Sequence, residues 1–176
     1  MAERDIFVVI PARGGSKSIG NKNLRPLVGV PLVAWSIETG KRLVDQERLL
    51  VSTESADIAD AARRYGATVV DRPARLASDQ SPTEPVMEHA LECVSAPEDG
   101  IVVLLQPTSP LRRESTVHAV VGAVLRGATS ALTVRSAHDF HWGLESGTAV
   151  RRYGHVYGAR TWSATTWRRG RYTLPR

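Results

Sequence analysis

The chain has few of the residues that mark secreted or membrane-spanning proteins. It contains a single cysteine, Cys93, so no internal disulfide can form. No apolar stretch reaches the roughly 18 residues that span a bilayer, and the start, Met-Ala-Glu-Arg-Asp, lacks the basic and apolar regions of a signal peptide. We therefore expect a cytoplasmic protein without a membrane partner. One cysteine within residues 86–94 is typical of a helix core, and we assign Cys93 no chemistry.

Residues 151–176, at the end of the chain, lack acidic side chains, and this absence explains the basic character of the chain. The formal net charge is +5, yet residues 151–176 contain seven arginines and no acid, which leaves 16 basic and 18 acidic residues in 1–150. The tail also contains tyrosine and tryptophan, and such a mixture can stack on single-stranded nucleic acid. Two alternatives stay open: a strand-rich end of the same domain, or a tail that does not belong to the fold. We do not expect nucleic acid as the main partner.

Up to about residue 135, apolar runs typical of strands alternate with helical patterns. The runs lie at 6–10, 48–52, 68–71, 101–105 and 131–135, and the helical patterns at 31–44, 55–65, 83–94 and 114–126. Continuous apolar strands separated by helices predict a mostly parallel sheet covered on both faces, a three-layer α/β/α, Rossmann-like fold. The length suits one domain of this kind. We place it at residues 1–145 and treat 146–176 as an atypical basic, aromatic tail.

Particular residues mark the expected ends of these helices. Pro31 suits the first position of the first helix, and Thr83 is expected to cap the third. Gly66 and Gly127 are expected just beyond the second and fourth helices, where a left-handed backbone commonly ends a helix.

The loop after the first strand has the composition of a phosphate-binding loop. Residues 10–23 read I-P-A-R-G-G-S-K-S-I-G-N-K-N, and they lack both the G-x-x-x-x-G-K-[ST] spacing of a P-loop and the G-x-G-x-x-G of a dinucleotide fold. Glycines allow backbone N–H groups to approach an anion closely, and Arg13, Lys17 and Lys22 add positive charge.

Polar segments follow the other expected strands as well. They include Ser52 to Ser55, then Arg72, then the stretch from Gln106 to Arg112. In open α/β sheets ligands bind at the carboxyl ends of the strands, so we expect these segments to meet at one site.

Several motifs together resemble the acylneuraminate cytidylyltransferase (CMP-N-acetylneuraminate synthetase) family. They occur in family order: I-P-A-R-G-G-S-K at 10–17 with N-K-N-L at 21–24, G-V-P-L-V-A-W-S-I at 29–37, V-S-T-E-S at 51–55, R-P-A-R-L-A-S-D at 72–79, S-P-T-E-P-V at 81–86 and L-L-Q-P-T-S-P-L-R at 104–112. The resemblance implies a nucleotide-diphospho-sugar-transferase-like fold and transfer of CMP from CTP to a nonulosonic, sialic-acid-like sugar, with release of pyrophosphate. It also implies Mg²⁺ as cofactor and a possible homodimer.

The resemblance also implies roles for individual residues. Lys22 and Arg13 are the expected catalytic cations, and the nucleotide would be held by Ala12, Arg13, Gly14, Ser16, Lys17, Lys22, Asn23, Arg72 and Thr83. The sugar would be held by Gln106, Thr108, Ser109 and Arg112. We expect Arg25, Arg75 and Arg113 to be solvated surface residues instead.

Some positions depart from the family pattern. Gly20 stands where proline is usual, and Glu54 replaces a common aspartate. The family's subunit-exchanging arm and its metal-binding aspartate pair are not recognisable in 146–176, so the metal ligands stay unknown. The composition of this tail suits an out-of-frame extension that is non-native or poorly ordered. Three functional hypotheses remain open: an active cytidylyltransferase, an impaired CTP-binding relic, and a module that binds nucleic acid or a partner through its basic tail.

Overall fold

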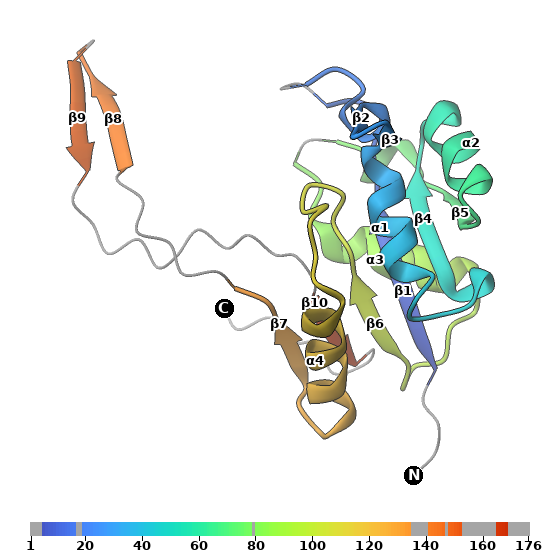
Figure 1. Cartoon of the computed structure of the whole chain (residues 1–176). Helices are drawn as coiled ribbons and strands as arrows, with labels where there is room; N and C mark the ends of the chain where they lie inside the picture. The colour runs from blue at the N-terminus through green and yellow to red at the C-terminus, as the bar shows by residue number, and fades with distance from the viewer. Residues whose placement is uncertain are drawn as a thin grey trace.

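The computed structural model describes residues 5–16, 19–78, 80–134, 141–146, 148–152 and 165–168. A six-stranded sheet with the order β5-β4-β1-β6-β10-β7 forms its centre (Figure 1). Its strands are β1 (Ile6–Pro11), β4 (Leu49–Thr53), β5 (Thr68–Asp71), β6 (Ile101–Leu104), β7 (Ser130–Leu132) and β10 (Thr165–Arg168). Strands β5, β4, β1 and β6 run parallel, whereas β10 pairs antiparallel with both β6 and β7.

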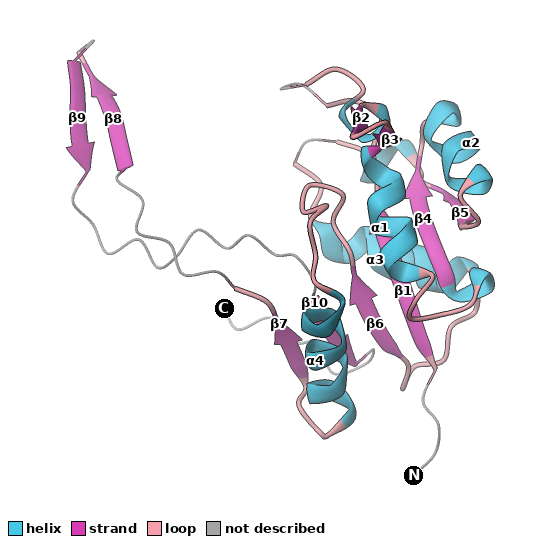
Figure 2. Ribbon diagram, in the orientation of Figure 1, coloured by secondary structure: helices cyan, strands magenta, loops and turns pink. Residues whose placement is uncertain are grey.

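Helices cover both faces of the sheet, as Figure 2 shows. They are α1 (Leu32–Gly40), α2 (Ala56–Arg64), α3 (Thr83–Cys93) and α4 (Glu114–Leu125). Alternate residues of β1 point to opposite faces: Val8 and Ile10 belong to the core shared with α1, α2 and α4, and Phe7 and Val9 to the core shared with α3. This confirms the predicted three-layer α/β/α fold with a mostly parallel sheet.

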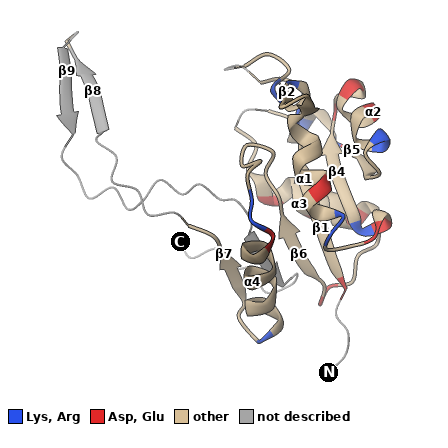
Figure 3. Ribbon diagram, viewed as in Figure 1, with Lys and Arg blue, Asp and Glu red and all other residues tan. Residues whose placement is uncertain are grey.

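The burial of the central strands explains their composition. Strands β1, β4 and β6 carry no charged residue (Figure 3), and each has a helix layer on both faces. A sheet covered on both faces requires continuous apolar runs rather than alternation. All five predicted strands and all four predicted helices are present, and their ends differ from the expected ones by a few residues.

The predicted helix ends are confirmed at two glycines and shifted at two prolines. Gly66 (φ +83°) and Gly127 (φ +121°) take the left-handed backbone that follows α2 and α4. Pro31, however, occupies the extended capping position of α1, so this helix begins one residue later than expected. Pro82 occupies the capping position of α3, so that helix begins at Thr83, one residue earlier than expected. Thr83 is therefore the first helical residue of α3 and not its cap.

The predicted core position of Cys93 is wrong, because its side chain is exposed. The buried face of α3 is formed by Val86, Met87, Ala90 and Leu91. That spacing places the next inward position at 94, and Cys93 lies beside the buried face rather than on it.

Shorter elements complete the described chain. Three 3-10 turns are η1 (Lys22–Leu24), η2 (Gln46–Arg48) and η3 (Ala74–Leu76). Two antiparallel pairs are β2 (Pro26–Leu27) with β3 (Val30–Pro31), and β8 (His141–Glu145) with β9 (Thr148–Arg152). The boundary that we expect at residue 145 falls between β8 and β9, and β10 lies within the predicted tail. Across the described residues, none of the helices has the length and apolar character needed to cross a membrane.

Candidate functional site

A cavity of about 240 Å³ lies at the carboxyl ends of the parallel strands. It is lined by residues that follow β1, β5 and β6, together with the start of α3. Eight of the residues predicted from the sequence line this cavity: Arg13, Ser16, Lys22, Asn23, Arg72, Thr83, Gln106 and Thr108. The expected convergence is therefore present for the segments after β1, β5 and β6, whereas Ser52 to Ser55 are not among the residues that line the cavity.

Other predicted residues lie elsewhere. Ala12, Gly14, Ser109 and Arg112 are not among the residues that line this cavity. Lys17 lies outside the described residues. The roles assigned to all these residues remain predictions. The positions of the described ones separate residues that can touch a ligand in the cavity from residues that support the loops around it.

Arg72 is a buried cation at the cavity wall. Its Nε donates to Ser52 Oγ at 3.2 Å and its Nη2 to Ser52 O at 2.5 Å, at the carboxyl end of β4. Burial lowers the pKa of the Arg72 guanidinium; the nearby Glu54 carboxylate opposes this shift, and Arg13 adds to it. Its contacts with β4 hold the charge in place before any ligand arrives, which is the arrangement that favours electrostatic stabilisation.

The loop after β1 is held by hydrogen bonds along its backbone. Ala12 N donates to Ser52 O at 3.0 Å, and Asn23 Nδ2 donates to Arg13 O at 2.8 Å. Gly14 N donates to Glu54 Oε1 at 2.7 Å. We expected the Gly14 N–H to face a phosphate, but in this structure the Glu54 carboxylate accepts its hydrogen bond.

Arg112 connects the loop after β6 to helix α1. Its Nη1 donates to Ser36 Oγ at 3.0 Å, and its Nη2 donates to the carbonyl oxygen of Gln106. Desolvation lowers the pKa of the Arg112 guanidinium to about 10, so it stays charged at neutral pH. It lines a second cavity of about 360 Å³ together with Trp35 and Leu111. Gln106 and Thr108 line the first cavity instead.

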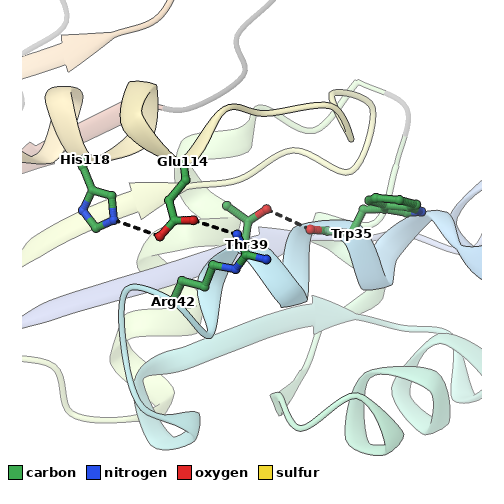
Figure 4. Close-up of polar contacts among 5 residues, drawn as sticks. All are labelled: Trp35, Thr39, Arg42, Glu114 and His118. Atoms are coloured by element: carbon green, nitrogen blue, oxygen red, sulfur yellow. Dashed lines mark hydrogen bonds and ion pairs between the residues drawn. The ribbon is translucent and has the colours of Figure 1, made fainter.

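The second cavity lies beside a polar network that links α1 to α4. Arg42 Nη1 donates to Glu114 Oε2 at 2.7 Å, and His118 Nε2 lies 3.5 Å from Glu114 Oε1 (Figure 4). On α1, Thr39 Oγ1 donates to the carbonyl oxygen of Trp35 at 2.9 Å. Arg112 was predicted as a site residue, but the residues of this polar network were not.

The sequence reasoning missed two serines of the main cavity. Ser78 and Ser81 both line it, and their Oγ atoms lie 2.7 Å apart. The motifs at 72–79 and 81–86 contain both residues, so the signal was present, but we assigned them no role. The expected surface positions of Arg25, Arg75 and Arg113 are confirmed, since all three are exposed.

Within the ranges that the structure describes, no three His, Cys, Asp or Glu side chains gather closely enough to bind a metal ion. Glu54 uses one oxygen to accept from Gly14, and Asp79 lies outside the described residues. The described residues therefore contain no metal site built from three such side chains.

Comparison with known sequences identifies relatives over most of the folded part. The cytidylyltransferase family model matches residues 7–141. The chain is 39% identical over 107 residues to N-acylneuraminate cytidylyltransferase of Escherichia coli O18:K1:H7, a match covering 61% of this chain and 25% of that protein. It is 41% identical over 122 residues to CMP-N,N'-diacetyllegionaminic acid synthase of Legionella pneumophila, covering 65% of this chain and 51% of that protein. The chain thus spans a quarter to a half of these relatives.

Solved structures share the fold at low sequence identity. A CMP:2-keto-3-deoxy-manno-octonic acid synthetase complexed with CTP superposes with a TM-score of 0.63 and 17% identity, covering 93% of this chain and 74% of that one. A 4-diphosphocytidyl-2C-methyl-D-erythritol synthase superposes with a TM-score of 0.66 and 13% identity, covering 96% and 76%. These likenesses support the fold, and the family match covers most of the main sheet. The chain belongs to the cytidylyltransferase family.

Proposed function

We propose that the protein binds CTP in the 240 Å³ cavity and transfers its CMP group to a nonulosonic acid, releasing pyrophosphate. One observation carries this proposal: three cationic residues from separate segments, Arg13, Lys22 and Arg72, line the same cavity as the polar residues Gln106 and Thr108. The names of the two sequence relatives support the same reaction class.

The chemistry requires positive charge more than it requires a reactive side chain. The anomeric hydroxyl oxygen of the sugar forms a bond to the α-phosphorus of CTP, and the bond from that phosphorus to pyrophosphate breaks. The hydroxyl loses its proton to solvent, and negative charge accumulates on the phosphate oxygens and on the leaving group. Positioning and cationic stabilisation therefore lower the barrier.

Each cation has a role in this proposal. Lys22 neutralises the α-phosphate, while Arg13 and Ser16 hold the rest of the triphosphate. Arg72 adds a fixed charge, because Ser52 holds its guanidinium at the end of β4. Thr83, the first residue of α3, presents a hydroxyl and a helix N-terminus to the nucleotide.

The sugar would lie at the β6 side of the cavity. Gln106 and Thr108 can hydrogen-bond its hydroxyl groups from there. Arg112 donates to Ser36 and Gln106, so we propose that it supports the Gln106 loop rather than meeting the sugar carboxylate. The relatives are named for two different acids, and our proposal therefore extends to the nonulosonic class only.

Magnesium, a homodimer and a cytoplasmic location remain predictions. Mg²⁺ would neutralise triphosphate charge through the phosphate oxygens themselves. The described residues supply no carboxylate cluster for it, so we derive no step of the reaction through a metal.

Pyrophosphate release tests the proposed reaction. The protein is incubated with CTP, MgCl₂ and either N-acetylneuraminate or N,N'-diacetyllegionaminate. We expect Lys22→Met to lower turnover by about a hundredfold or more, as does the removal of other groups that stabilise developing charge. Lys41→Met is the matched control, because Lys41 is exposed and pairs with Glu38 on α1.

The outcomes separate the hypotheses. Wild-type release no greater than that of Lys22→Met would contradict the proposed reaction. Calorimetry with CTP then shows whether nucleotide binding persists without turnover, which would favour the impaired relic instead.

A further inference from the structure

We infer that Glu54 and Asn23 clamp the Arg13–Gly14 peptide group, and that Glu54 is a positioning residue that orients Arg13 for the nucleotide. This inference rests on the proposed function for the identity of the ligand. The clamp itself is formed by residues of the chain alone.

The two side chains hold opposite sides of one peptide group. The carbonyl oxygen of Arg13 accepts from Asn23 Nδ2 at 2.8 Å, and the N–H of Gly14 donates to Glu54 Oε1 at 2.7 Å. Asn23 belongs to η1 and is 5% exposed, whereas Glu54 follows β4. Since a peptide group is planar and rigid, fixing its oxygen and its hydrogen fixes its rotation. The backbone that carries the Arg13 side chain is thereby oriented.

Packing prevents the peptide group from shifting toward α2. A Cβ atom added to Gly14 would lie 2.9 Å from the Cβ of Ser55, so the backbone already touches the turn after β4. One residue earlier, Ala12 N donates to Ser52 O at 3.0 Å. Three successive residues of the loop are therefore anchored to the segment from Ser52 to Ser55 or to η1.

The clamp depends on the length of the Glu54 side chain. An aspartate is shorter by one methylene, about 1.5 Å, which would leave its oxygen roughly 4 Å from Gly14 N, beyond hydrogen-bond range. A glutamine has the same reach and keeps an acceptor oxygen without the charge. The negative charge alone has a second effect, since Glu54 opposes the lowering of the Arg72 pKa. The length and the charge of the Glu54 side chain can therefore be tested separately, with aspartate and with glutamine.

The clamp is tested first without nucleotide, by amide hydrogen exchange at Gly14 in the full chain followed by NMR. We expect the Gly14 amide to exchange about tenfold more slowly in wild type and Glu54→Gln than in Glu54→Asp and Glu54→Ala. A tenfold difference in exchange rate corresponds to the free energy of one modest hydrogen bond. A Gly14 amide that exchanges equally fast in wild type and Glu54→Ala would overturn the clamp, whatever the protein binds.

The positioning role is tested by CTP affinity, measured by calorimetry with the same variants. We expect Glu54→Asp and Glu54→Ala to weaken binding about tenfold and Glu54→Gln by about threefold or less. Glu47→Ala is the control, because Glu47 is an exposed carboxylate in η2, before β4 rather than after it. Equal thermal midpoints across the variants would exclude a loss of folding as the cause.

The reverse order of affinities would overturn the inference. If Glu54→Asp binds CTP like wild type and Glu54→Gln does not, the charge acts rather than the clamp. If the wild-type protein binds no CTP, the proposed function and the positioning role both fail, while the exchange measurement still decides whether the clamp exists.

Discussion

Two arginines, Arg72 buried and Arg112 partly buried, show how strongly single side chains depend on their partners in this fold. Burial lowers the pKa of both Arg72 and Arg112, because a charge is less stable away from water. Each keeps hydrogen-bond acceptors that offset part of this cost: Ser52 for Arg72, and Ser36 with Gln106 for Arg112. A change that removes one acceptor takes a hydrogen bond away from a guanidinium that is shielded from water, which costs more than the loss of an exposed bond would.

Replacing Ser36 by alanine tests this cost at Arg112. Ser36 is fully buried, and its Oγ accepts from Arg112 Nη1 at 3.0 Å. We expect Ser36→Ala to lower the free energy of unfolding by about 1–2 kcal/mol, measured by urea denaturation. In an Arg112→Met background the same change should cost about 1 kcal/mol less, because the hydrogen bond from Arg112 to Ser36 is already absent. An equal cost in both backgrounds would show that the hydroxyl does not act through Arg112.

At the scale of elements, the hairpin of β2 and β3 contains a local conflict between sequence and backbone. Its two turn residues, Val28 and Gly29, have φ values of +53° and +79°. Glycine adopts this conformation readily, whereas a β-branched residue does so at a cost of about 1–2 kcal/mol. Val28 is also 85% exposed, so it gains little from burial in return.

Replacing Val28 by asparagine should therefore stabilise the protein. Asparagine tolerates the left-handed conformation and is favoured before glycine in two-residue hairpin turns. We expect the free energy of unfolding to rise by about 1 kcal/mol and the thermal midpoint by about 2–4 °C. Val134→Asn is the control, since Val134 is 72% exposed and has no positive φ. An equal gain in the free energy of unfolding for Val134→Asn would show that replacing an exposed valine stabilises the protein whatever its φ value.

A second element-level contact joins the end of α1 to the start of α4. The hydrogen bond from Arg42 lowers the pKa of Glu114 from its usual 4.5, and His118 adds to the effect. Because the folded pKa lies below the unfolded value, the contact contributes stability above about pH 4.5 and loses it as the pH falls through the folded pKa. Both side chains are well exposed, so the contribution is small and sensitive to salt.

Carboxyl titration by NMR measures this contact directly. We expect Arg42→Ala to move the pKa of Glu114 upward, toward 4.5, and 0.5 M NaCl to shift it in the same direction. Lys41→Ala should leave it unchanged, since Lys41 pairs with Glu38. An equal pKa for Glu114 in wild type and in Arg42→Ala would contradict the contact shown in Figure 4.

At the scale of the whole molecule, the sheet is completed by a strand from near the end of the chain. Strand β10 lies between β6 and β7 and runs antiparallel to both. Strand β6 is buried at every residue. Without β10, its backbone N–H and C=O groups would have a partner on one side only, and an unpaired apolar edge favours association between molecules.

Two truncations test the contribution of β10. A chain that stops after residue 152 lacks the strand, whereas one that stops after residue 168 keeps it. We expect the shorter chain to unfold at lower urea and to associate in a concentration-dependent way in size-exclusion chromatography. Coincident unfolding curves for the two chains would contradict a structural role for β10 and would favour our placement of the domain boundary near residue 145.

The sequence predicts much of the fold because its main signals are local. Each predicted strand up to residue 135 is an apolar run, and Gly66 and Gly127 mark helix ends through backbone conformations that glycine adopts easily. The position of β10 has no comparable signal. Its four residues, Thr165 to Arg168, form no apolar run, and their pairing depends on backbone groups that every sequence carries.

The sequence by itself determined the alternation of strands and helices, the family, and the segments that gather at the carboxyl edge of the sheet. Local apolar runs and capping residues decide these features, and the direction of parallel strands brings their ends together. Only the tertiary structure decided what each side chain does there. Arg72 lines the main cavity while Arg112 bonds to Ser36, and Gly14 donates to Glu54. The reason is that a long side chain can reach several acceptors, and folding decides which of them come within hydrogen-bond distance.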